Sequence, residues 1–504
     1  MTFNIIATLF NFFLTIVIGI FLTPFLVSHL GPANFGLIPL TTALISYFAV
    51  FTQTISSAIN RNLTISIQRQ DRALAQRIYF SSIVGSGLVI LILSIPLTLI
   101  SLNISSLVNM PAGAQAEGRL LSLAMSCVFL LSIASLPFVS VIFAQNKTYL
   151  QAMSLALQNV VRFGLTILFV LFVAASIASV GIAVAISALA SFIFVILASF
   201  RAVPWLDPMQ RAFDRREFND LFRLSADIFV MQVGTVAMVS SELVAVNLLF
   251  GDDTGGRYAA VVQLAFMLRS AVISLASLAA PVIIADYAHG NMGVVARSTI
   301  RTMKLIAVAV ALPTGFLAAM ASETLAAWLG TSFSSWGSLL ALQAAMLALS
   351  SVVVPLYSVC LAARKMWWPG LAQLCCALSF IGCAWIGSGT LAGPLSLAAL
   401  FLGISVTKEL FYMVPYAARC IGIATGRFAT PVIYSVILFV TAYLYAKSLG
   451  YVWPARSLPA LVCIGLAITA PYLTTAWLLA TSRERADIRL MLGQSQFGRW
   501  FAGF

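Results

Sequence analysis

The sequence predicts an all-α membrane protein that crosses the bilayer about fourteen times. Of its 504 residues, 61% are hydrophobic and only 9% are charged, whereas soluble domains carry about 25% charged residues. The apolar residues form runs close to the roughly 20 that a helix needs to cross about 30 Å of hydrocarbon. Composition therefore excludes a soluble protein. The net charge of +13 comes from cations in short loops, which does not indicate a nucleic-acid partner.

Hydropathy divides the chain into two lobes and a final pair of spans. The first apolar run is too long for the core of a signal peptide and has no basic residue before it, so we expect it to remain as a span. In the N-terminal lobe, residues 1–200, the expected spans are 5–29, 36–60, 78–101, 119–143, 149–175 and 180–200. In the C-terminal lobe, residues 224–417, they are 224–249, 257–284, 303–322, 337–363, 367–388 and 394–417. The last pair, within residues 430–481, is 430–447 and 457–481.

Two polar segments connect or follow these spans. Residues 201–223 alternate aromatic side chains with Arg and Asp, and the tail at 482–504 places apolar side chains beside Arg. This pattern is typical of amphipathic segments that lie at a lipid surface. We expect residues 201–223 to link the lobes and residues 482–504 to form a tail, both on the cytoplasmic side.

The distribution of Lys and Arg predicts the orientation. Of the 28 Lys and Arg residues, 21 lie in one set of alternating loops and four in the opposite set. Loops rich in Lys and Arg stay in the cytoplasm. Both termini are therefore expected in the cytoplasm of a multi-pass protein of the bacterial cytoplasmic, or inner, membrane.

A repeated motif indicates two related halves. LGPANFGL at residues 30–37 opens a helical hairpin, and LFGDDTGGRYA at residues 249–259 does the same in the second half. Gly31 corresponds to Gly251 and Gly36 to Gly256, both at an offset of 220 residues. Internal repeats of this kind are common in transporter folds.

Three cations fall inside expected spans: Arg162, Arg269 and Lys408. A charge at mid-bilayer costs about 2.5–3.5 kcal/mol on insertion scales, so each needs a wet cavity or a partner. Gln158 and Asn159 precede Arg162 by four and three residues and share its helix face. These five residues are the candidate anion site. Lys408 lies nearer the interface, where its long side chain can also reach water.

Acidic residues inside the spans are fewer. Glu242 and Asp227 lie on the seventh expected span and Glu409 on the twelfth. One alternative to an anion site is that acids and cations form structural ion pairs, such as Glu242 with Arg269 or Glu409 within its own neighbourhood.

Signatures of enzymes and metal sites are missing from the sequence. It has no P-loop, no HExxH and no GxSxG motif. The seven Cys lie in or beside spans and read as packing residues, and two His are too few for a metal cluster. We therefore predict a transporter without catalytic residues, metal or cofactor.

The full chain resembles the polysaccharide repeat-unit flippases, the Wzx type that serves O-antigen and exopolysaccharide pathways. These belong to the MOP exporter superfamily, with the lipid II flippases and the multidrug/toxin extruders. The resemblance rests on LGPANFGL (30–37), SSAINRN (56–62), LFGDDTGGRYA (249–259), LRSAVISLASLAAP (268–281) and ETLAAWLGTSF (323–333), and on the order of six, six and two spans.

The resemblance implies a cargo, partners and a mechanism. The cargo is a polyprenyl diphosphate carrying an oligosaccharide, moved by alternating access of two rocking lobes for surface polysaccharide biosynthesis. Arg162 and Arg269 hold the diphosphate midway. Glu242, Glu409 and Asp227 are candidates for proton or sodium coupling. Polymerase and export proteins of the same pathway are the implied protein partners.

Three alternatives stay open at this point. A lipid II flippase has the same general architecture. A multidrug or cation extruder needs an acidic cavity, whereas here cations match or outnumber acids inside the spans. A scaffold or polymerase subunit of a sugar-assembly complex needs no central cations at all.

Overall fold

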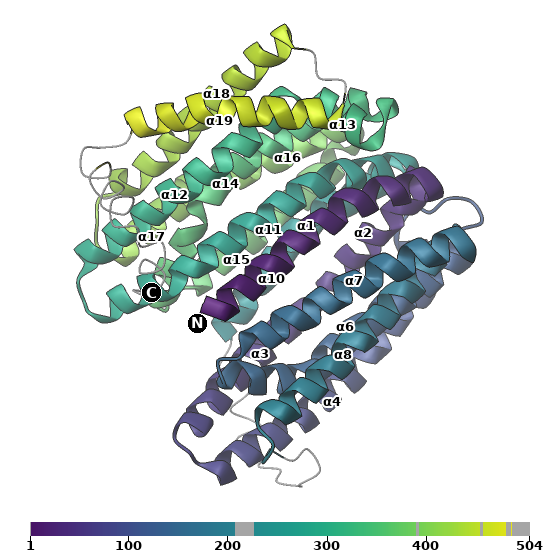
Figure 1. The fold of residues 1–504 in the computed structure, drawn as a ribbon, viewed down its shortest axis with the longest axis vertical. Coiled ribbons are helices and arrows are strands. Elements are labelled where there is room, and N and C mark those ends of the chain that lie inside the picture. The colour runs from purple at the N-terminus through teal and green to yellow at the C-terminus, as the bar shows by residue number, and fades with distance from the viewer. Residues whose placement is uncertain (1, 207–225, 390–392, 454–456, 480–484, 486–504) are drawn as a thin grey trace. The chain divides into compact units, whose positions relative to one another are not determined.

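The computed structural model describes residues 2–206, 226–389, 393–453, 457–479 and 485 (Figure 1). In these ranges all regular structure is helical, which confirms the all-α prediction. The helices divide into two compact units. Unit 1 consists of residues 1–260 and 370–389, and unit 2 of residues 261–369 and 390–504. The lobes and linker expected from the sequence remain predictions, since only residues 201–206 of the linker and Arg485 of the tail are described.

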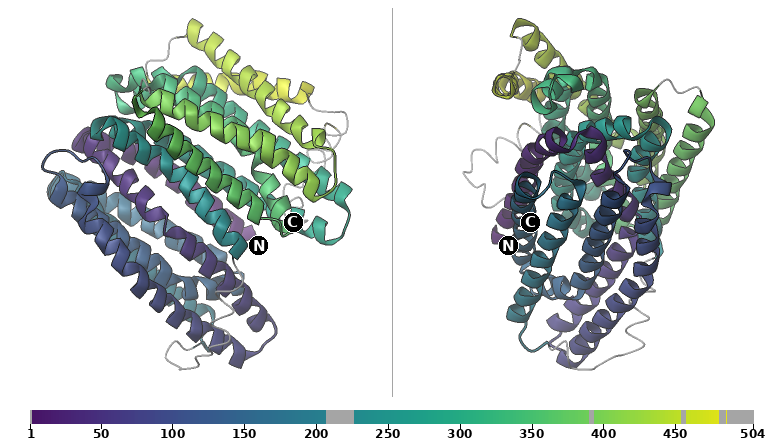
Figure 2. Two further views of the ribbon diagram at one scale, coloured as in Figure 1. Left: turned by 180° about the vertical axis from the view of Figure 1, so that it is seen from behind. Right: turned by 90° about the vertical axis from the view of Figure 1, so that its right-hand side faces the viewer.

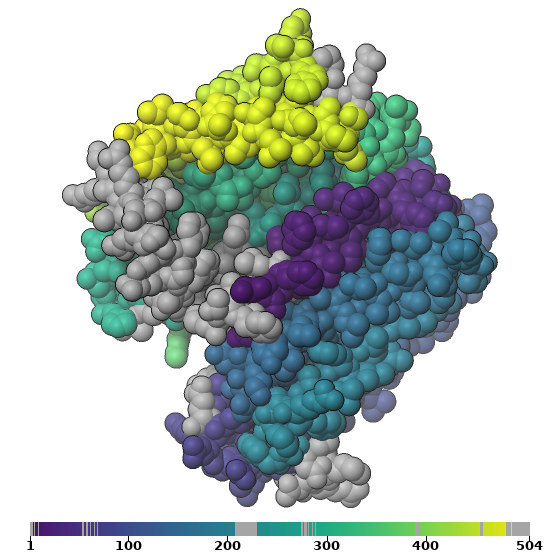
Figure 3. All heavy atoms as spheres, in the orientation of Figure 1, coloured from purple at the N-terminus to yellow at the C-terminus, as the bar shows by residue number. Residues whose placement is uncertain are grey.

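Unit 1 contains the first half of the chain and one later helix. Its elements are α1 (Thr2–Leu30), α2 (Pro32–Ser46), α3 (Ala49–Gln68), α4 (Arg72–Leu102), α5 (Ile104–Leu107), α6 (Gln115–Ala144), α7 (Thr148–Phe172), α8 (Ile177–Ala202), α10 (Ala226–Phe250), the start of α11 (Asp252–Ala288), most of α15 (Trp367–Ile386) and η2 (Gly387–Gly389). The helices α6, α7 and α8 lie side by side (Figures 1 and 2). In the space-filling view α1, in purple, lies along α7, in blue (Figure 3).

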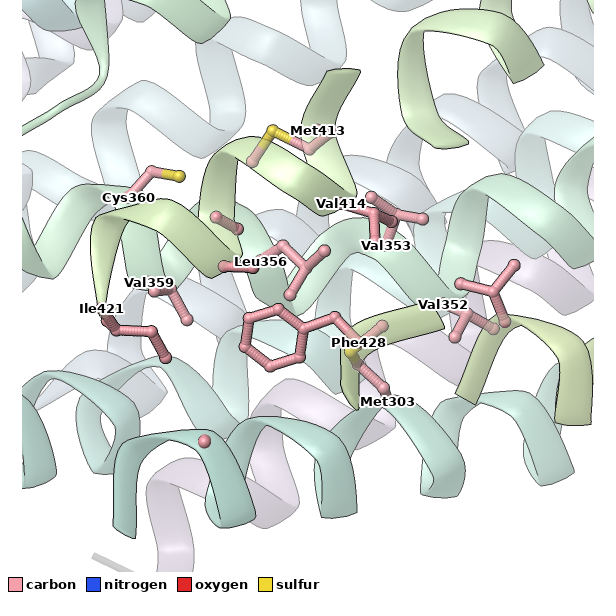
Figure 4. Packing of buried hydrophobic residues seen from close by; sticks show 14 of the residues in the cluster. Met303, Val352, Val353, Leu356, Val359, Cys360, Met413, Val414, Ile421 and Phe428 are labelled. Atoms are coloured by element: carbon pink, nitrogen blue, oxygen red, sulfur yellow. The ribbon is translucent and has the colours of Figure 1, made fainter. Parts of the chain in front are cut away.

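Unit 2 contains the rest of α11 and the elements that follow it, apart from α15. These are α12 (Met292–Ala319), α13 (Ala321–Leu329), η1 (Thr331–Trp336), α14 (Gly337–Ala362), α16 (Pro394–Thr407), the π-helix η3 (Lys408–Met413), α17 (Val414–Cys420), α18 (Gly426–Val452) and α19 (Leu458–Leu479). Phe428 of α18 lies in a core formed with Met303 of α12, Leu356 of α14 and Val414 of α17 (Figure 4).

Thirteen helices in the described residues are long and apolar enough to cross a membrane. Each matches one of the fourteen expected spans. The span expected at residues 36–60 forms two helices instead, because the chain turns at Tyr47 and Phe48 between α2 and α3. α2 has only 15 residues, and α3 is a more polar helix with Asn60 and Arg61. The protein is thus a multi-pass membrane protein in which the expected second span is divided between two helices.

Candidate functional site

The repeated glycines of the two halves contact each other within unit 1. Gly31 (φ +78°) and Gly251 (φ +85°) immediately precede α2 and α11, in a backbone conformation that favours glycine. Five residues further along each helix, Gly36 and Gly256 cross. A Cβ on Gly36 would lie 2.4 Å from the Cα of Gly256, and one on Gly256 would lie 2.0 Å from the carbonyl oxygen of Pro32. Only glycine permits so close a backbone approach.

Helix α10 is packed against several elements of unit 1 through small and polar residues. Ser240 is 2.9 Å from Ser46 at the end of α2. A Cβ on Gly234 would lie 2.5 Å from the carbonyl oxygen of Gly370, so α10 and α15 also cross at glycine. These contacts surround the helix that carries Glu242 and place it in a tightly packed environment.

Hydrogen bonds between Asn247 and Asn109 join the C-terminal end of α10 to the segment between α5 and α6. The Oδ1 of Asn247 accepts from the backbone N–H of Asn109 at 2.9 Å. Its Nδ2 donates to the carbonyl oxygen of Asn109 at 3.1 Å, and Asn109 Nδ2 donates to the carbonyl oxygen of Asn247 at 2.7 Å. Three mutual hydrogen bonds fix the position of α10 just before it turns into α11.

The Glu242 carboxylate accepts a hydrogen bond from the hydroxyl of Tyr258, in the second turn of α11. Both side chains are buried, at 7% and 0% exposure. A buried carboxylate is costly unless it is hydrogen-bonded, and this phenol satisfies part of that requirement. The pairing with Arg269 considered from the sequence stays a hypothesis, because Glu242 belongs to unit 1 and Arg269 to unit 2.

Arg162 lies on α7, on the side opposite its exposed apolar stripe. That stripe consists of Met153, Leu157, Val160, Leu168 and Leu171, which are 37–53% exposed. The Nε of Arg162 is buried and has no hydrogen-bond partner in the described part of the chain, and the same holds for the hydroxyl of Thr166, one turn away. Buried polar atoms in native proteins nearly always have partners, so these two atoms leave unused hydrogen-bonding capacity on one helix face.

The two polar residues before Arg162 are placed differently from each other. Asn159 donates to the hydroxyl of Thr15 on α1 at 2.9 Å and lies 3.4 Å from Oδ1 of Asn11. Its amide therefore joins α7 to α1. Gln158 is half-buried. Around Arg162 the structure thus gathers a cation, a hydroxyl and two amides on one face of α7.

A second cluster lies in unit 2. Lys408 and Glu409 form an ion pair with 2.6 Å between Nζ and Oε1, although they are consecutive residues. Tyr357 of α14 joins both: its hydroxyl donates to Oε1 of Glu409 at 3.1 Å and accepts from Lys408 Nζ at 3.3 Å. Lys408 and Glu409 are 7% and 8% exposed. Arg269 of α11 is half-buried, and its charge acts on Tyr357.

The π-helix explains how Lys408 and Glu409 come to share a partner. Both lie at the start of η3, whose wider turn rearranges the backbone between α16 and α17. Single π-turns within α-helices occur frequently at functional sites. Asp227, the third acidic candidate, lies at the start of α10, but its side chain is outside the described part.

The sequence analysis did not single out Tyr258 and Tyr357. A tyrosine within an apolar span carries a hydroxyl that needs a partner when buried, and that signal could have linked each to an acidic residue. That signal does not identify which acidic residue each tyrosine contacts, because the tyrosine and the glutamate of each pair lie on different helices.

Comparison with known proteins identifies the family of this chain. Residues 1–285 match the family of polysaccharide biosynthesis proteins. The chain belongs to this family. It is 28% identical over 502 residues to the uncharacterized membrane protein EpsK of Bacillus subtilis (strain 168), covering 97% of both chains.

Among solved structures, the family member resembles the lipid II flippase MurJ in an inward closed conformation. The TM-score is 0.67 at 14% identity, with 95% of this chain and 99% of MurJ covered. It also resembles an inward-facing multidrug resistance MATE transporter of the MOP superfamily, with a TM-score of 0.66 at 12% identity, covering 82% and 94%. At these identities the likeness establishes the fold.

Proposed function

We propose that this protein translocates polyprenyl-diphosphate-linked oligosaccharide repeat units across the bacterial cytoplasmic membrane for surface polysaccharide biosynthesis. Membership in the polysaccharide biosynthesis family supports the pathway. The buried Nε of Arg162, without a partner in the described residues, is the observation that carries the substrate class. An arginine held inside a membrane protein with a free donor is suited to an anionic ligand.

The diphosphate is the part of this cargo that needs the protein. Its charges lose their water when they enter a medium of low dielectric constant, and fixed cations offset much of that cost. Arg162 with Gln158 and Asn159 forms the anion-binding group of the N-terminal lobe in our proposal. Arg269 and Lys408 form that of the C-terminal lobe. The lipid tail stays in the bilayer while the two lobes alternate access to the head group.

The Lys408–Glu409 pair suggests how transport is coupled to protons. With Glu409 ionised, the pair is neutral and Lys408 is occupied by its neighbour. Protonation of Glu409 removes that partner and leaves a cation for the diphosphate. Anion binding and protonation of Glu409 then favour each other, and this linkage is reciprocal. Glu242 and Asp227 are the further acidic candidates, and Glu242 is already held by Tyr258.

The experiment compares export by arginine variants in a deletion strain. Arg162→Ala and Arg269→Ala should nearly abolish surface polysaccharide per unit of membrane-inserted carrier. Each charge-assisted hydrogen bond contributes about 1.5–3 kcal/mol, or roughly ten- to a hundredfold in affinity. Lys at either position should retain part of the activity, because it keeps the charge without the planar fork. Arg119→Ala is the matched control, since Arg119 is exposed near the start of α6.

Two outcomes would contradict the proposal. Normal export by the double variant Arg162→Ala, Arg269→Ala at normal abundance would refute the anion site. Loss of folded protein in the single variants would instead assign the arginines a structural role.

The likeness to MurJ over nearly its whole length favours one alternative cargo, lipid II. The two are separated by the intermediate that accumulates on the cytoplasmic face after deletion. If lipid II accumulates, lipid II and not the oligosaccharide repeat unit is the cargo.

A further inference from the structure

Cys360 and Cys420 meet at one end of unit 2. Cys360 is in the last turn of α14 and Cys420 ends α17, and their side chains lie close together in one core cluster. Both belong to the same core cluster, in which Cys360 is fully buried and Cys420 is half-buried. Figure 4 shows Cys360 on the same side of this cluster as Ile421, the residue after Cys420. The two thiols are 60 positions apart in the sequence but adjacent in the fold.

Two tyrosines of η3 and α17 lie beside this pair. Tyr416, which contacts Cys420, donates from its hydroxyl to the carbonyl oxygen of Lys365 at 3.1 Å, and its ring stacks on Tyr412 with 5.5 Å between centroids. Lys365, which is exposed, follows the last turn of α14. The thiolate is the form of a cysteine that attacks oxidants.

We propose that Cys360 and Cys420 are a redox-active dithiol that closes to an intrachain disulfide on exposure to peroxide. The thiolate of Cys420, the more exposed of the two, attacks one peroxide oxygen and breaks the O–O bond, giving a sulfenic acid and water. The thiol of Cys360 loses its proton and attacks the Cys420 sulfur, which releases a second water. Overall, two thiols are oxidised to one disulfide and one hydrogen peroxide is reduced to two waters.

The disulfide ties together the two helices that hold the ion cluster. Tyr357 lies one turn before Cys360 on α14, and η3, with Lys408 and Glu409, leads directly into α17. A covalent bond between the ends of α14 and α17 therefore restrains Tyr357 relative to Glu409. If these residues must separate during transport, which rests on the proposed function, oxidation stops the carrier.

The chemical test uses the full-length protein in membranes. After treatment with hydrogen peroxide, free thiols are blocked with N-ethylmaleimide and the unreduced protein is digested with trypsin. The peptide of residues 420–427 should be released only after reduction. The number of alkylated cysteines should fall from seven by two. Cys383, exposed on α15, should stay alkylated and serves as the internal control. Recovery of peptide 420–427 in alkylated or over-oxidised form, unlinked to Cys360, would overturn the assignment.

The second arm measures export after a brief peroxide treatment of cells. Wild-type carrier should lose most of its export and regain it on reduction, while Cys420→Ser should be unaffected. If the disulfide forms but wild-type export is unchanged, the claim that oxidation stops transport is refuted, while the claim that the two cysteines form a disulfide stands. Absence of the disulfide refutes the dithiol whatever the cargo is, so this failure is distinct from that of the proposed function.

Discussion

Replacing Gly36 by Ala tests the glycine crossing between α2 and α11. The added methyl carbon would lie 2.4 Å from the Cα of Gly256 and 3.0 Å from its backbone nitrogen. Ordinary contact begins at 3.4 Å, so the two helices must separate by about 1 Å. The obstacle is backbone on a neighbouring helix, which cannot rotate away as a side chain can.

The cost follows from overpacking. Inserting a methyl group into a well-packed contact costs about 1–3 kcal/mol, against which alanine regains about 0.5–1 kcal/mol of helix propensity. The net destabilisation is therefore at most about 2.5 kcal/mol, with about 1 kcal/mol in the middle of the range. Gly256→Ala, whose methyl would lie 2.0 Å from the carbonyl oxygen of Pro32, should cost at least as much. The double variant should cost less than the two together, because the first separation makes room for the second methyl.

The assay is the thermal midpoint of detergent-extracted protein, followed as the monodisperse fraction on size exclusion. Gly164→Ala on α7 is the control, since a Cβ at Gly164 would have no neighbouring atom within 4 Å. We expect Gly36→Ala to melt below the wild type and Gly164→Ala at or above it. Equal midpoints for Gly36→Ala and Gly164→Ala would refute the close crossing.

Three further predictions concern buried polar contacts. Asn247→Ala removes the two hydrogen bonds that its side chain makes with the backbone of Asn109 and should lower the thermal midpoint, whereas a midpoint equal to the wild type would show that they contribute nothing. Tyr258→Phe leaves the Glu242 carboxylate without its phenol donor and should reduce folded yield; Glu242→Gln should restore part of it, and failure of that rescue counts against the contact. Lys408→Met removes the cationic partner of the buried Glu409 and should lower the free energy of unfolding by about 3–5 kcal/mol. The double variant Lys408→Met, Glu409→Leu should recover most of the folded yield. A double variant whose loss equals the sum of the two single losses would contradict the ion pair.

The helical architecture could be predicted from the sequence because hydropathy reports directly on lipid contact. Thirteen expected spans correspond to helices in the described residues. The break at Tyr47 and Phe48 could not be predicted, because no Gly or Pro stands near it. The glycine repeat was also visible in the sequence, since only glycine serves at a crossing that close. That the two copies contact each other required the structure.

The candidate site was predictable in its residue types but not in its pairings. Polar spacing placed Gln158, Asn159 and Arg162 on one helix face, and the structure shows that Asn159 contacts α1. For Lys408 and Glu409 the sequence suggested separate roles, anion binding and ion coupling, with a structural ion pair of Glu409 within its own neighbourhood as the alternative. Consecutive residues on an α-helix point about 100° apart, and a π-helix cannot be read from spacing. The structure shows a direct ion pair between them, and the contact of Tyr357 with both residues is information that only the fold supplies.

The placement of α15 in unit 1 has a consequence for biosynthesis. The chain emerges from the ribosome in order, and α10 is made long before its partner helix. Residues 261–369 must be synthesised first, which takes about 5–20 s at 5–20 residues per second. During that interval the Gly234 face of α10 lacks the helix that covers it in the finished protein. Unit 1 can therefore complete its packing only after about half of unit 2 has been synthesised, and a chain that stops before residue 370 leaves both units unfinished.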